Sequence, residues 1–268
     1  METKDISPRI GTEVRIDRND LINGTHAAAI DRLLKERGAL VFRGMHLNDE
    51  EQLSFAQSLG EVVPLGEDGV SKISLDPKVS PVADYTRGAF YWHIDGANDD
   101  VPAKATMLTA KVLADEGGDT LIANTYAAYD DLPDDDKELI DGVRVFHSLE
   151  ASQRMVNPEP SYADLLRWQE RPSRTHPLVW KHQSGRNSLL LGATALYVRD
   201  MDMEEGNRLL CRLRDWASKP EYVYRHNWAV GDLLVWDNTG TMHRAADYPL
   251  DSQRLMHRTT LHGEEPIA

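Results

Sequence analysis

The chain has 268 residues, of which 41% are hydrophobic and 28% are charged, as is typical of one globular domain covering residues 1–268. Acidic residues outnumber basic ones by 44 to 30, and the resulting net charge of −14 disfavours nucleic acid as a partner. The apolar runs are far shorter than the roughly 20 residues that cross a bilayer, and the N-terminus lacks a signal-peptide pattern. We therefore expect a cytoplasmic protein without a membrane segment.

The opening third predicts helices and one strand in alternation. Residues 25–38 carry apolar side chains at helical spacing and stop at a glycine, and residues 39–44 read as a buried strand. A second helix over residues 48–59 begins with an Asn-Asp-Glu-Glu cap and ends before a glycine. Residues 60–91 show no sustained period, so we expect a loop with short strands that is suited to substrate contacts.

From residue 103 onward the pattern becomes rich in strands. We expect strands over residues 105–113, 119–124, 178–181, 188–191, 222–228, 232–236 and 254–261. A Ser-Gly-Arg turn joins the third and fourth of these into a hairpin. Acidic segments at 130–138 and 201–205 are predicted to begin helices, because negative charge suits the N-terminal end of a helix dipole. This arrangement predicts a mainly β fold with flanking helices and a jelly-roll core.

The single cysteine, Cys211, excludes an intramolecular disulfide and is compatible with a reducing compartment. It lies in a predicted amphipathic helix over residues 203–219. The apolar side of that helix carries Leu209, Leu210, Leu213 and Trp216. We therefore expect Cys211 to be a buried structural thiol rather than a nucleophile.

The segment Trp92-His93-Ile94-Asp95 contains the most informative pair of residues. His93 and Asp95 are two positions apart, a spacing that puts both side chains on one face of a strand or at its end. His243 follows a strand pattern that reaches a turn, which could return its ring to the same place. Two histidines and one carboxylate form the ligand set of non-haem Fe(II) oxygenases. A His-x-Asp pair or a lone histidine is common by chance, so the ligand prediction depends on the three occurring together.

Several further segments accompany these residues in a recognisable order. They are Trp92–Gly96, Asp115–Leu121, Asn124–Tyr129, Thr175–Val179, Trp236–Asn238 with His243, and Asp247–Tyr248 followed by Arg254–Arg258. With them the chain resembles the taurine dioxygenase branch of the Fe(II)/2-oxoglutarate-dependent dioxygenases. The resemblance implies a double-stranded β-helix, a distorted jelly roll, with the metal near one open end.

The same resemblance implies that His93, Asp95 and His243 bind Fe(II), and that 2-oxoglutarate and O2 are cosubstrates. The implied reaction converts 2-oxoglutarate to succinate and CO2 and hydroxylates a substrate carbon, while the protein positions the reactants. Halogenating relatives have a small residue in place of the carboxylate, so Asp95 implies hydroxylation, with or without later fragmentation or desaturation. Members of the family are commonly homo-oligomers, and the resemblance therefore leads us to expect a homo-oligomer here.

Two arginines and a threonine are implied to bind the cosubstrate. Arg254, eleven residues after His243, and Thr120 match the residues that hold the distal carboxylate of 2-oxoglutarate. A planar guanidinium suits this task because it makes two parallel charge-assisted hydrogen bonds. Arg258 lies four residues further on and on the same strand face. In this family its position is near the metal-bound end of the cosubstrate and the anionic group of the substrate.

The expected substrate is a small or medium organic acid. Taurine itself is disfavoured, because no histidine stands between His46 and His93, where taurine-using relatives have one that binds the sulfonate. The candidate substrate contacts near the motif are Tyr85, Arg87, Phe90, Tyr91 and Asn98, with Arg258 as an anion anchor. An uncharged substrate is the alternative, in which case Arg258 serves only the cosubstrate or the structure.

Other functions remain open from the residues alone. Two histidines and a carboxylate also suit zinc in a hydrolase or isomerase on a similar barrel, although such an enzyme does not need Arg254. A binding protein of the same fold that has lost its chemistry is a third possibility. Arg254 and Arg258 could be solvated strand charges, and Thr120 an ordinary strand residue.

Two histidines and two tryptophans near the motifs are expected to be structural. His257 should face away from a site that its alternate neighbours occupy, and His176 has no expected chemical role. Trp92 and Trp236 are expected in the core and the wall of the pocket.

Overall fold

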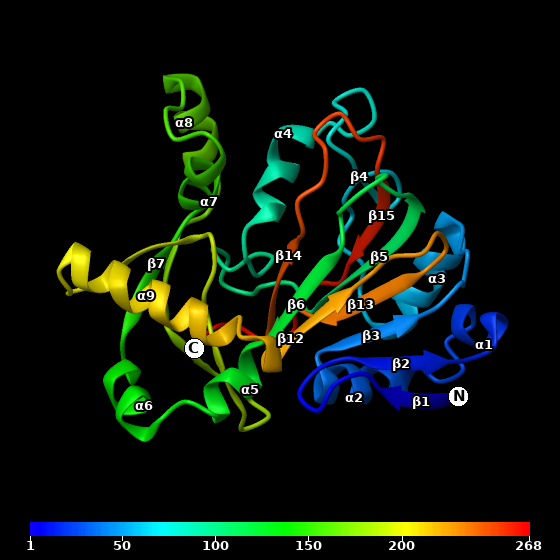
Figure 1. Ribbon diagram of the computed structural model, residues 1–268, viewed down its shortest axis with the longest axis horizontal. Helices are drawn as coiled ribbons and strands as arrows, with labels where there is room; N and C mark the ends of the chain where they lie inside the picture. The colour runs from blue at the N-terminus through cyan, green and yellow to red at the C-terminus, as the bar shows by residue number, and fades with distance from the viewer.

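Two antiparallel sheets packed face to face form the centre of the computed structural model, which describes residues 1–268 (Figure 1). The larger sheet has seven strands in the order β1 (Glu2–Asp5), β2 (Thr12–Arg15), β3 (Ala39–Phe42), β13 (Leu233–Asp237), β5 (Ala105–Val112), β15 (Leu255–Thr260) and β4 (Ser71–Ile73). Only β2 and β3 pair in parallel. The smaller sheet has the order β12 (Val223–His226), β6 (Thr120–Asn124) and β14 (Thr241–Ala245). This arrangement is a jelly roll, so the predicted fold class is confirmed.

Strand β13 shows how the sequence pattern creates the layers. Leu234 and Trp236 point between the two sheets, where they pack with Ile122 of β6. Leu233 and Val235 point the other way and pack against helices α2 (Ala27–Arg37) and α3 (Asp49–Leu59). Because alternate residues of a strand face opposite sides, a strand that is buried on both faces reads as one continuous apolar run.

The N-terminal helices agree with the sequence analysis. Helix α3 has the expected capping box, in which the Asn48 side chain accepts from the Glu51 amide and the Glu51 side chain accepts from the Asn48 amide. Helix α2 ends at Gly38 and α3 at Gly60. A further short helix, α1 (Arg18–Ile22), was not predicted.

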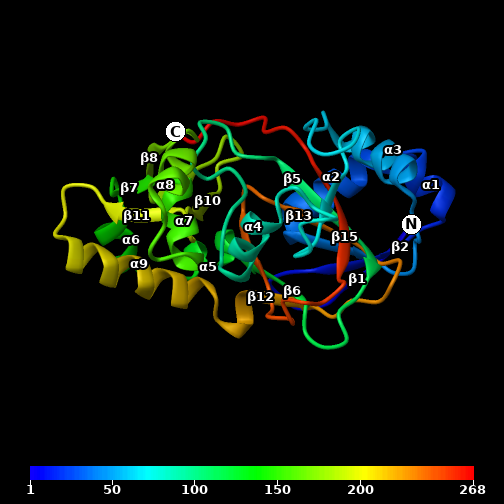
Figure 2. The same cartoon turned by 90° about the horizontal axis from the view of Figure 1, so that it is seen from above.

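A second group of helices and short strands packs at the other end of the jelly roll (Figure 2). Its helices are α5 (Thr125–Asp130), α6 (Asp134–Ile140), α7 (Leu149–Val156), α8 (Tyr162–Gln169) and α9 (Met203–Ala217), with the 3-10 helix η2 (Pro220–Tyr222). Helix α4 (Ala83–Thr86) and the 3-10 helix η1 (Arg87–Phe90) lie between this group and the larger sheet, and η1 contacts both α7 and β14 (Figure 2). Its strands are β7 (Arg144–His147), β8 (Arg174–Pro177) and β11 (Ala195–Val198), and the hairpin of β9 (Val179–Lys181) and β10 (Asn187–Leu189). None of the helices is both long and apolar enough to span a membrane.

The prediction for Cys211 is wrong, because its side chain is exposed on α9. The buried face of this helix is formed by Gly206, Leu209, Leu213 and Ala217. Each is three or four residues from the next, which keeps them on one stripe. Cys211 is two residues from both leucines, so its side chain points away from that stripe.

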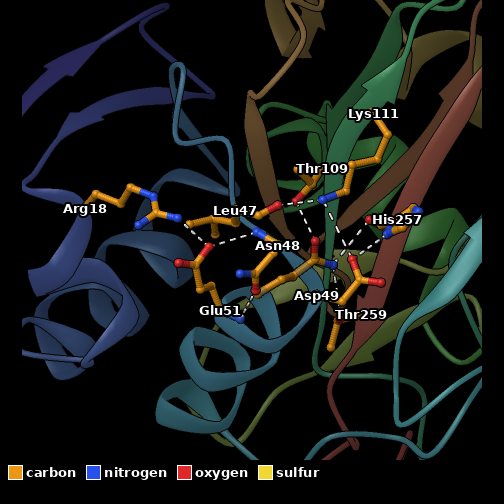
Figure 3. Close-up of polar contacts among 10 residues, drawn as sticks. Arg18, Leu47, Asn48, Asp49, Glu51, Thr109, Lys111, His257 and Thr259 are labelled. Atoms are coloured by element: carbon orange, nitrogen blue, oxygen red, sulfur yellow. Dashed lines mark hydrogen bonds and ion pairs between the residues drawn. The ribbon is translucent and has the colours of Figure 1, made fainter.

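A buried polar network fixes α3 to the outer face of the larger sheet (Figure 3). The Gln52 side chain donates to the Thr259 hydroxyl at 3.0 Å and accepts from the Thr109 hydroxyl at 2.5 Å. Beside it, His257 Nδ1 lies 2.6 Å from an Asp49 carboxylate oxygen. His257 therefore faces α3, as expected, and its neighbour Arg258 points to the opposite side of β15.

At the end of β13 the carboxyl group of Asp237 is almost completely buried. Its Oδ1 accepts from the Thr239 amide at 3.0 Å and from the Thr239 hydroxyl at 2.7 Å, whereas its buried Oδ2 has no hydrogen-bond partner. Burial raises the pKa of Asp237 to about 6, although the Thr239 hydrogen bonds and the charges of Arg186 and Lys35 act in the opposite direction.

Because Asp237 is buried, its ionisation should lower the free energy of unfolding as pH rises, and Asp237→Asn should remove this loss. The ordinary pKa is 3.8, so the folded state binds a proton more tightly than the unfolded state, and the wild type loses stability as pH rises from about 4 through about 6. The asparagine carries no charge, so its advantage should grow over this range and level off at about 3 kcal/mol. Denaturant unfolding from pH 4 to 8 measures it, with the exposed Asp251→Asn as control. An advantage independent of pH would contradict the prediction.

Candidate functional site

A pair of backbone hydrogen bonds brings the two distant histidines together. His93 N donates to His243 O at 3.0 Å, and His243 N donates to His93 O at 2.8 Å. Residues bridged in this way project their side chains to the same face, and the two ring centroids are 4.1 Å apart. His243 lies on β14 and His93 lies shortly after η1, so the bridge joins the smaller sheet to the loop that precedes β5.

The Asp95 carboxylate completes a cluster of three donors. Its Oδ1 is 3.7 Å from His93 Nε2 and its Oδ2 is 3.8 Å from His243 Nε2. One donor atom from each of the three residues lies within 4.8 Å of the others. The Asn238 side chain holds the backbone here: it accepts from Asp95 N at 2.9 Å and donates to Asp95 O at 2.8 Å.

The protonation states in this cluster suit a metal ion. His93 Nδ1 lies 2.8 Å from the Tyr91 carbonyl oxygen, which can only accept, so Nδ1 carries a proton and Nε2 is the ring nitrogen that faces the cluster. Burial, with the nearby His93, lowers the pKa of His243 to about 3, so this ring is neutral at pH 7.

Asp95 is ionised although it is partly buried. Burial opposes its ionisation, but the neighbouring His243, Arg258 and His93, together with a hydrogen bond of 3.0 Å from the Thr106 hydroxyl, hold the pKa of Asp95 well below its ordinary value. Two imidazoles and one carboxylate that face a common space fit a divalent transition metal, and the donor set is the one typical of Fe(II) oxygenases.

The cluster opens into a cavity of about 500 Å³, a volume suited to small-molecule ligands. The predicted residues that line it are Tyr85, His93, Asp95, Asn98, Thr120, His243, Arg254 and Arg258. The other three candidates, Arg87, Phe90 and Tyr91, lie on or next to η1 and do not line it. Instead, Phe90 packs against the ring of Tyr248, a residue of the cavity wall, and Tyr91 donates its hydroxyl to Met155 O at 2.9 Å. Their proximity to the motif in sequence did not bring their side chains to the cavity.

Arg254 is a buried guanidinium without an ion-pair partner. It is 3% exposed, donates from Nη2 to Gly118 O at 3.0 Å, and lies 4.9 Å from the centroid of the Tyr248 ring. Burial lowers the pKa of this guanidinium below its ordinary value. An unpaired buried cation is costly, so this position is suited to an anionic ligand.

The other two candidate cosubstrate residues, Thr120 and Arg258, line the same cavity as Arg254. The Thr120 hydroxyl accepts from Trp228 Nε1 at 3.1 Å, which fixes the oxygen and leaves its proton to donate. Arg258 has a buried Nε without a hydrogen-bond partner, and its charge lowers the pKa of Asp95. The cavity therefore offers two guanidinium groups and a hydroxyl beside the three-donor cluster.

The structure adds residues that the sequence analysis did not assign to the site. Thr106 and Asn238 orient Asp95, and Arg244 and Arg171 line the cavity. Trp236 is buried and lines the cavity, as expected, with its ring 4.6 Å from that of His243. Asn238 was visible within a quoted motif, but Thr106 is identified only by its hydrogen bond. His176 is structural, as expected, because its Nε2 donates to Asp99 O at 2.9 Å.

The comparisons with known proteins agree with this geometry. The model of the family described as "Taurine catabolism dioxygenase TauD, TfdA family" matches residues 2–260. The α-ketoglutarate-dependent 2,4-dichlorophenoxyacetate dioxygenase of Cupriavidus pinatubonensis is 35% identical over 266 residues, covering 91% of each chain. The α-ketoglutarate-dependent sulfate ester dioxygenase of Pseudomonas putida is 31% identical over 286 residues, covering 100% of this chain and 91% of the relative.

Among solved structures, that of AAD-2 in complex with Mn(II) and N-oxalylglycine has a TM-score of 0.90 and 29% identity, covering 100% of this chain and 99% of that one. Sequence, fold and the His-Asp-His cluster thus agree. The chain belongs to the TauD/TfdA family and is a 2-oxoglutarate-dependent dioxygenase that uses Fe(II) and O2.

Proposed function

We propose that His93, Asp95 and His243 hold the Fe(II) ion, and that residues 1–268 act as one dioxygenase domain. The observation that carries this assignment is the convergence of the three donor atoms within 4.8 Å in the wall of a cavity. The Nδ1 hydrogen bond of His93 and the Thr106 hydrogen bond to Asp95 support it, because metal ligands are oriented by partners of this kind.

The same proposal assigns the cosubstrate to the three remaining polar groups. Arg254 and Thr120 bind the distal carboxylate of 2-oxoglutarate, and Arg258 lies toward its metal-bound end. The buried, unpaired guanidinium of Arg254 supports this, since a dicarboxylate supplies the charge it lacks. A zinc hydrolase would have no use for this group, so the alternative of a hydrolase on the same barrel is disfavoured.

The protein's part in the reaction is to position and enclose the reactants. When bound, Fe(II) with 2-oxoglutarate supplies the oxidising chemistry that inserts oxygen into a substrate C–H bond. Asn238 and Thr106 fix Asp95, and Gly118 and Tyr248 fix Arg254, so both ends of the cosubstrate meet side chains that are already oriented. The apolar wall, which includes Ile94, limits contact between the reacting carbon and water.

We further propose that the substrate is a small or medium organic anion with an apolar body. The cavity is lined by apolar residues together with several arginines, which suits a molecule of that kind. Two relatives act, by their names, on 2,4-dichlorophenoxyacetate and on sulfate esters, which are anions with apolar bodies. Tyr85 and Asn98 are the proposed substrate contacts among the residues near the motif.

Succinate release tests the substrate class. The purified enzyme with Fe(II), 2-oxoglutarate and O2 would be given 2,4-dichlorophenoxyacetate, an alkyl sulfate and taurine, and the neutral amide or alcohol of each of the first two. We expect the first two anions to raise succinate release above the background without substrate. Stimulation by the neutral compounds alone would contradict the organic-acid proposal and leave the dioxygenase assignment intact.

Gly118 provides a test of how Arg254 is held. Its φ is +75°, and a Cβ added to it would lie 2.9 Å from Arg254 Nε. We expect Gly118→Ala to raise the KM for 2-oxoglutarate on the order of tenfold, because a displacement that costs about 1.4 kcal/mol has that effect. Gly142→Ala is a matched control, with φ +74° and open space around the added carbon. Equal KM values in the two variants, measured by succinate release, would contradict the prediction.

A further inference from the structure

Arg244 is a fourth guanidinium group in the same cavity, and the proposed chemistry does not use it. It follows His243 on β14, so its side chain leaves the strand on the face opposite to the metal cluster. Trp92 occupies the corresponding position before His93, and the Arg244 guanidinium carbon lies 5.7 Å from the centroid of its ring. Arg244 nevertheless lines the cavity, which therefore extends past the bridge between the two histidines.

The charge of Arg244 has no counterpart in the protein. In a chain with an excess of acidic residues, most arginines outside the cavity form an ion pair with a carboxylate. Arg244 forms none, and its buried Nε has no hydrogen-bond partner. A half-buried guanidinium in this condition retains part of the cost of desolvation, which an anionic ligand would offset.

The other three arginines of the cavity lie near acidic groups or are already assigned. Arg171 acts on Asp99, where burial raises the pKa of the carboxyl group and the charge of Arg171 opposes that rise. Arg258 acts in the same way on Asp95. Arg254 and Arg258 are, moreover, the proposed partners of the two carboxylates of 2-oxoglutarate. Arg244 is therefore the cavity arginine that has neither an acidic neighbour nor an assigned ligand.

The cavity wall contributed by the neighbouring elements is uncharged. Leu149, Ser152 and Gln153 from α7 line the cavity, as do Gly88 and Ala89 from η1. Helix η1 contacts both α7 and β14, the strand that carries Arg244. None of these five residues carries a charge. This wall accommodates the apolar body of a ligand and offers no anion that would compete for Arg244.

We propose that Arg244 binds the anionic group of the substrate and so determines the specificity of the enzyme for organic anions. The inference rests on the proposed function, and it assigns the anchor to a residue other than Arg258. A guanidinium fork binds a carboxylate or a sulfate through two parallel hydrogen bonds, so either oxyanion fits this position. The body of the substrate then extends from Arg244 toward the metal cluster along the shared cavity.

The experiment compares Arg244→Gln, Arg244→Lys and Arg171→Gln in the holoenzyme, with the exposed Arg208→Gln of α9 as an inert control. The probes are 2,4-dichlorophenoxyacetate, an alkyl sulfate and their neutral counterparts, and the readouts are the KM for each probe and the KM for 2-oxoglutarate. We expect Arg244→Gln to raise the KM for the anions about 10- to 100-fold, as loss of a charged hydrogen bond does. The KM for 2-oxoglutarate should not change, and Arg244→Lys should recover part of the loss.

Four outcomes would overturn the inference while leaving the dioxygenase assignment in place. The first two are an unchanged KM for the anions in Arg244→Gln and a loss that appears in Arg171→Gln instead. The third is a wild type that responds to neutral compounds alone or to none of the probes, and the fourth is a parallel rise in the KM for 2-oxoglutarate in Arg244→Gln, which would indicate a cosubstrate role. An enzyme that releases no succinate from 2-oxoglutarate under any condition would instead contradict the proposed function itself, and the inference with it.

Discussion

Replacing His243 by alanine should abolish turnover and weaken Fe(II) binding by more than about 100-fold, since loss of a metal ligand exceeds the 10- to 100-fold cost of losing a residue that only orients one. The imidazole is one of three donors, and the other two cannot move to replace it. Asp95 is held by Asn238 on its backbone and by Thr106 on its carboxylate, and His93 is fixed by the Tyr91 carbonyl. Fe(II) affinity measured under anaerobic conditions, together with succinate release, checks the prediction.

Thr106→Val is the matched control for this loss. It keeps all three donors and removes only the hydroxyl that donates to Asp95 Oδ2 at 3.0 Å. We expect its Fe(II) affinity to fall by roughly 10- to 100-fold, less than that of His243→Ala, with turnover recovered at high Fe(II) concentration. If His243→Ala bound Fe(II) as the wild type does, the ligand assignment would be wrong. Circular dichroism of both variants separates a local change from unfolding.

Replacing Arg254 by glutamine should raise the KM for 2-oxoglutarate on the order of 100-fold, because truncating one partner of a buried charge pair costs about 2–5 kcal/mol. The guanidinium is 3% exposed, so water cannot replace its hydrogen bonds to the ligand. Contacts with Gly118 and Tyr248 fix the orientation of this guanidinium. The expected effect of the substitution is therefore weaker binding of 2-oxoglutarate. Initial rates of succinate release as a function of 2-oxoglutarate concentration check the prediction.

Arg254→Lys distinguishes charge from geometry at this position. An ammonium group keeps the charge but lacks the planar fork, so it should recover only part of the affinity for 2-oxoglutarate. Fe(II) affinity should stay at the wild-type value in both Arg254 variants, because Arg254 is not a proposed metal ligand. An unchanged KM for 2-oxoglutarate in Arg254→Gln would contradict the cosubstrate assignment, whatever its effect on stability.

The local patterns of the sequence predicted the fold class and the strand faces of the site. The alternation along β15 correctly indicated that Arg254 and Arg258 face inward while His257 faces α3. The pairing of β15 with β5 shifts register between Leu255 and Met256. This shift does not turn Arg254 away, because its side chain still lines the cavity. The His-x-Asp spacing was informative for the same reason, since both members lie within one short segment.

What could not be predicted depends on contacts between distant segments. The bridge between His93 and His243 joins residues 150 positions apart in sequence, and the hydrogen bond from Thr106 to Asp95 depends on how β5 lies beside the metal segment. Arg244 was not assigned to the site from the sequence, because its place in the cavity wall depends on how η1 packs against β14. The exposure of Cys211 was misjudged because the helix buries a narrower stripe than the apolar residues around it suggested.

An anaerobic titration of the wild-type enzyme with Fe(II) and 2-oxoglutarate tests the central claim most directly. If His93, Asp95 and His243 hold the metal and leave positions for the 2-oxo acid, the mixture should develop the weak visible charge-transfer band of a bidentate complex. The band should be absent in His243→Ala and should require more 2-oxoglutarate in Arg254→Gln. A wild-type protein that binds Fe(II) without developing this band, or a band that persists in His243→Ala, would contradict the account.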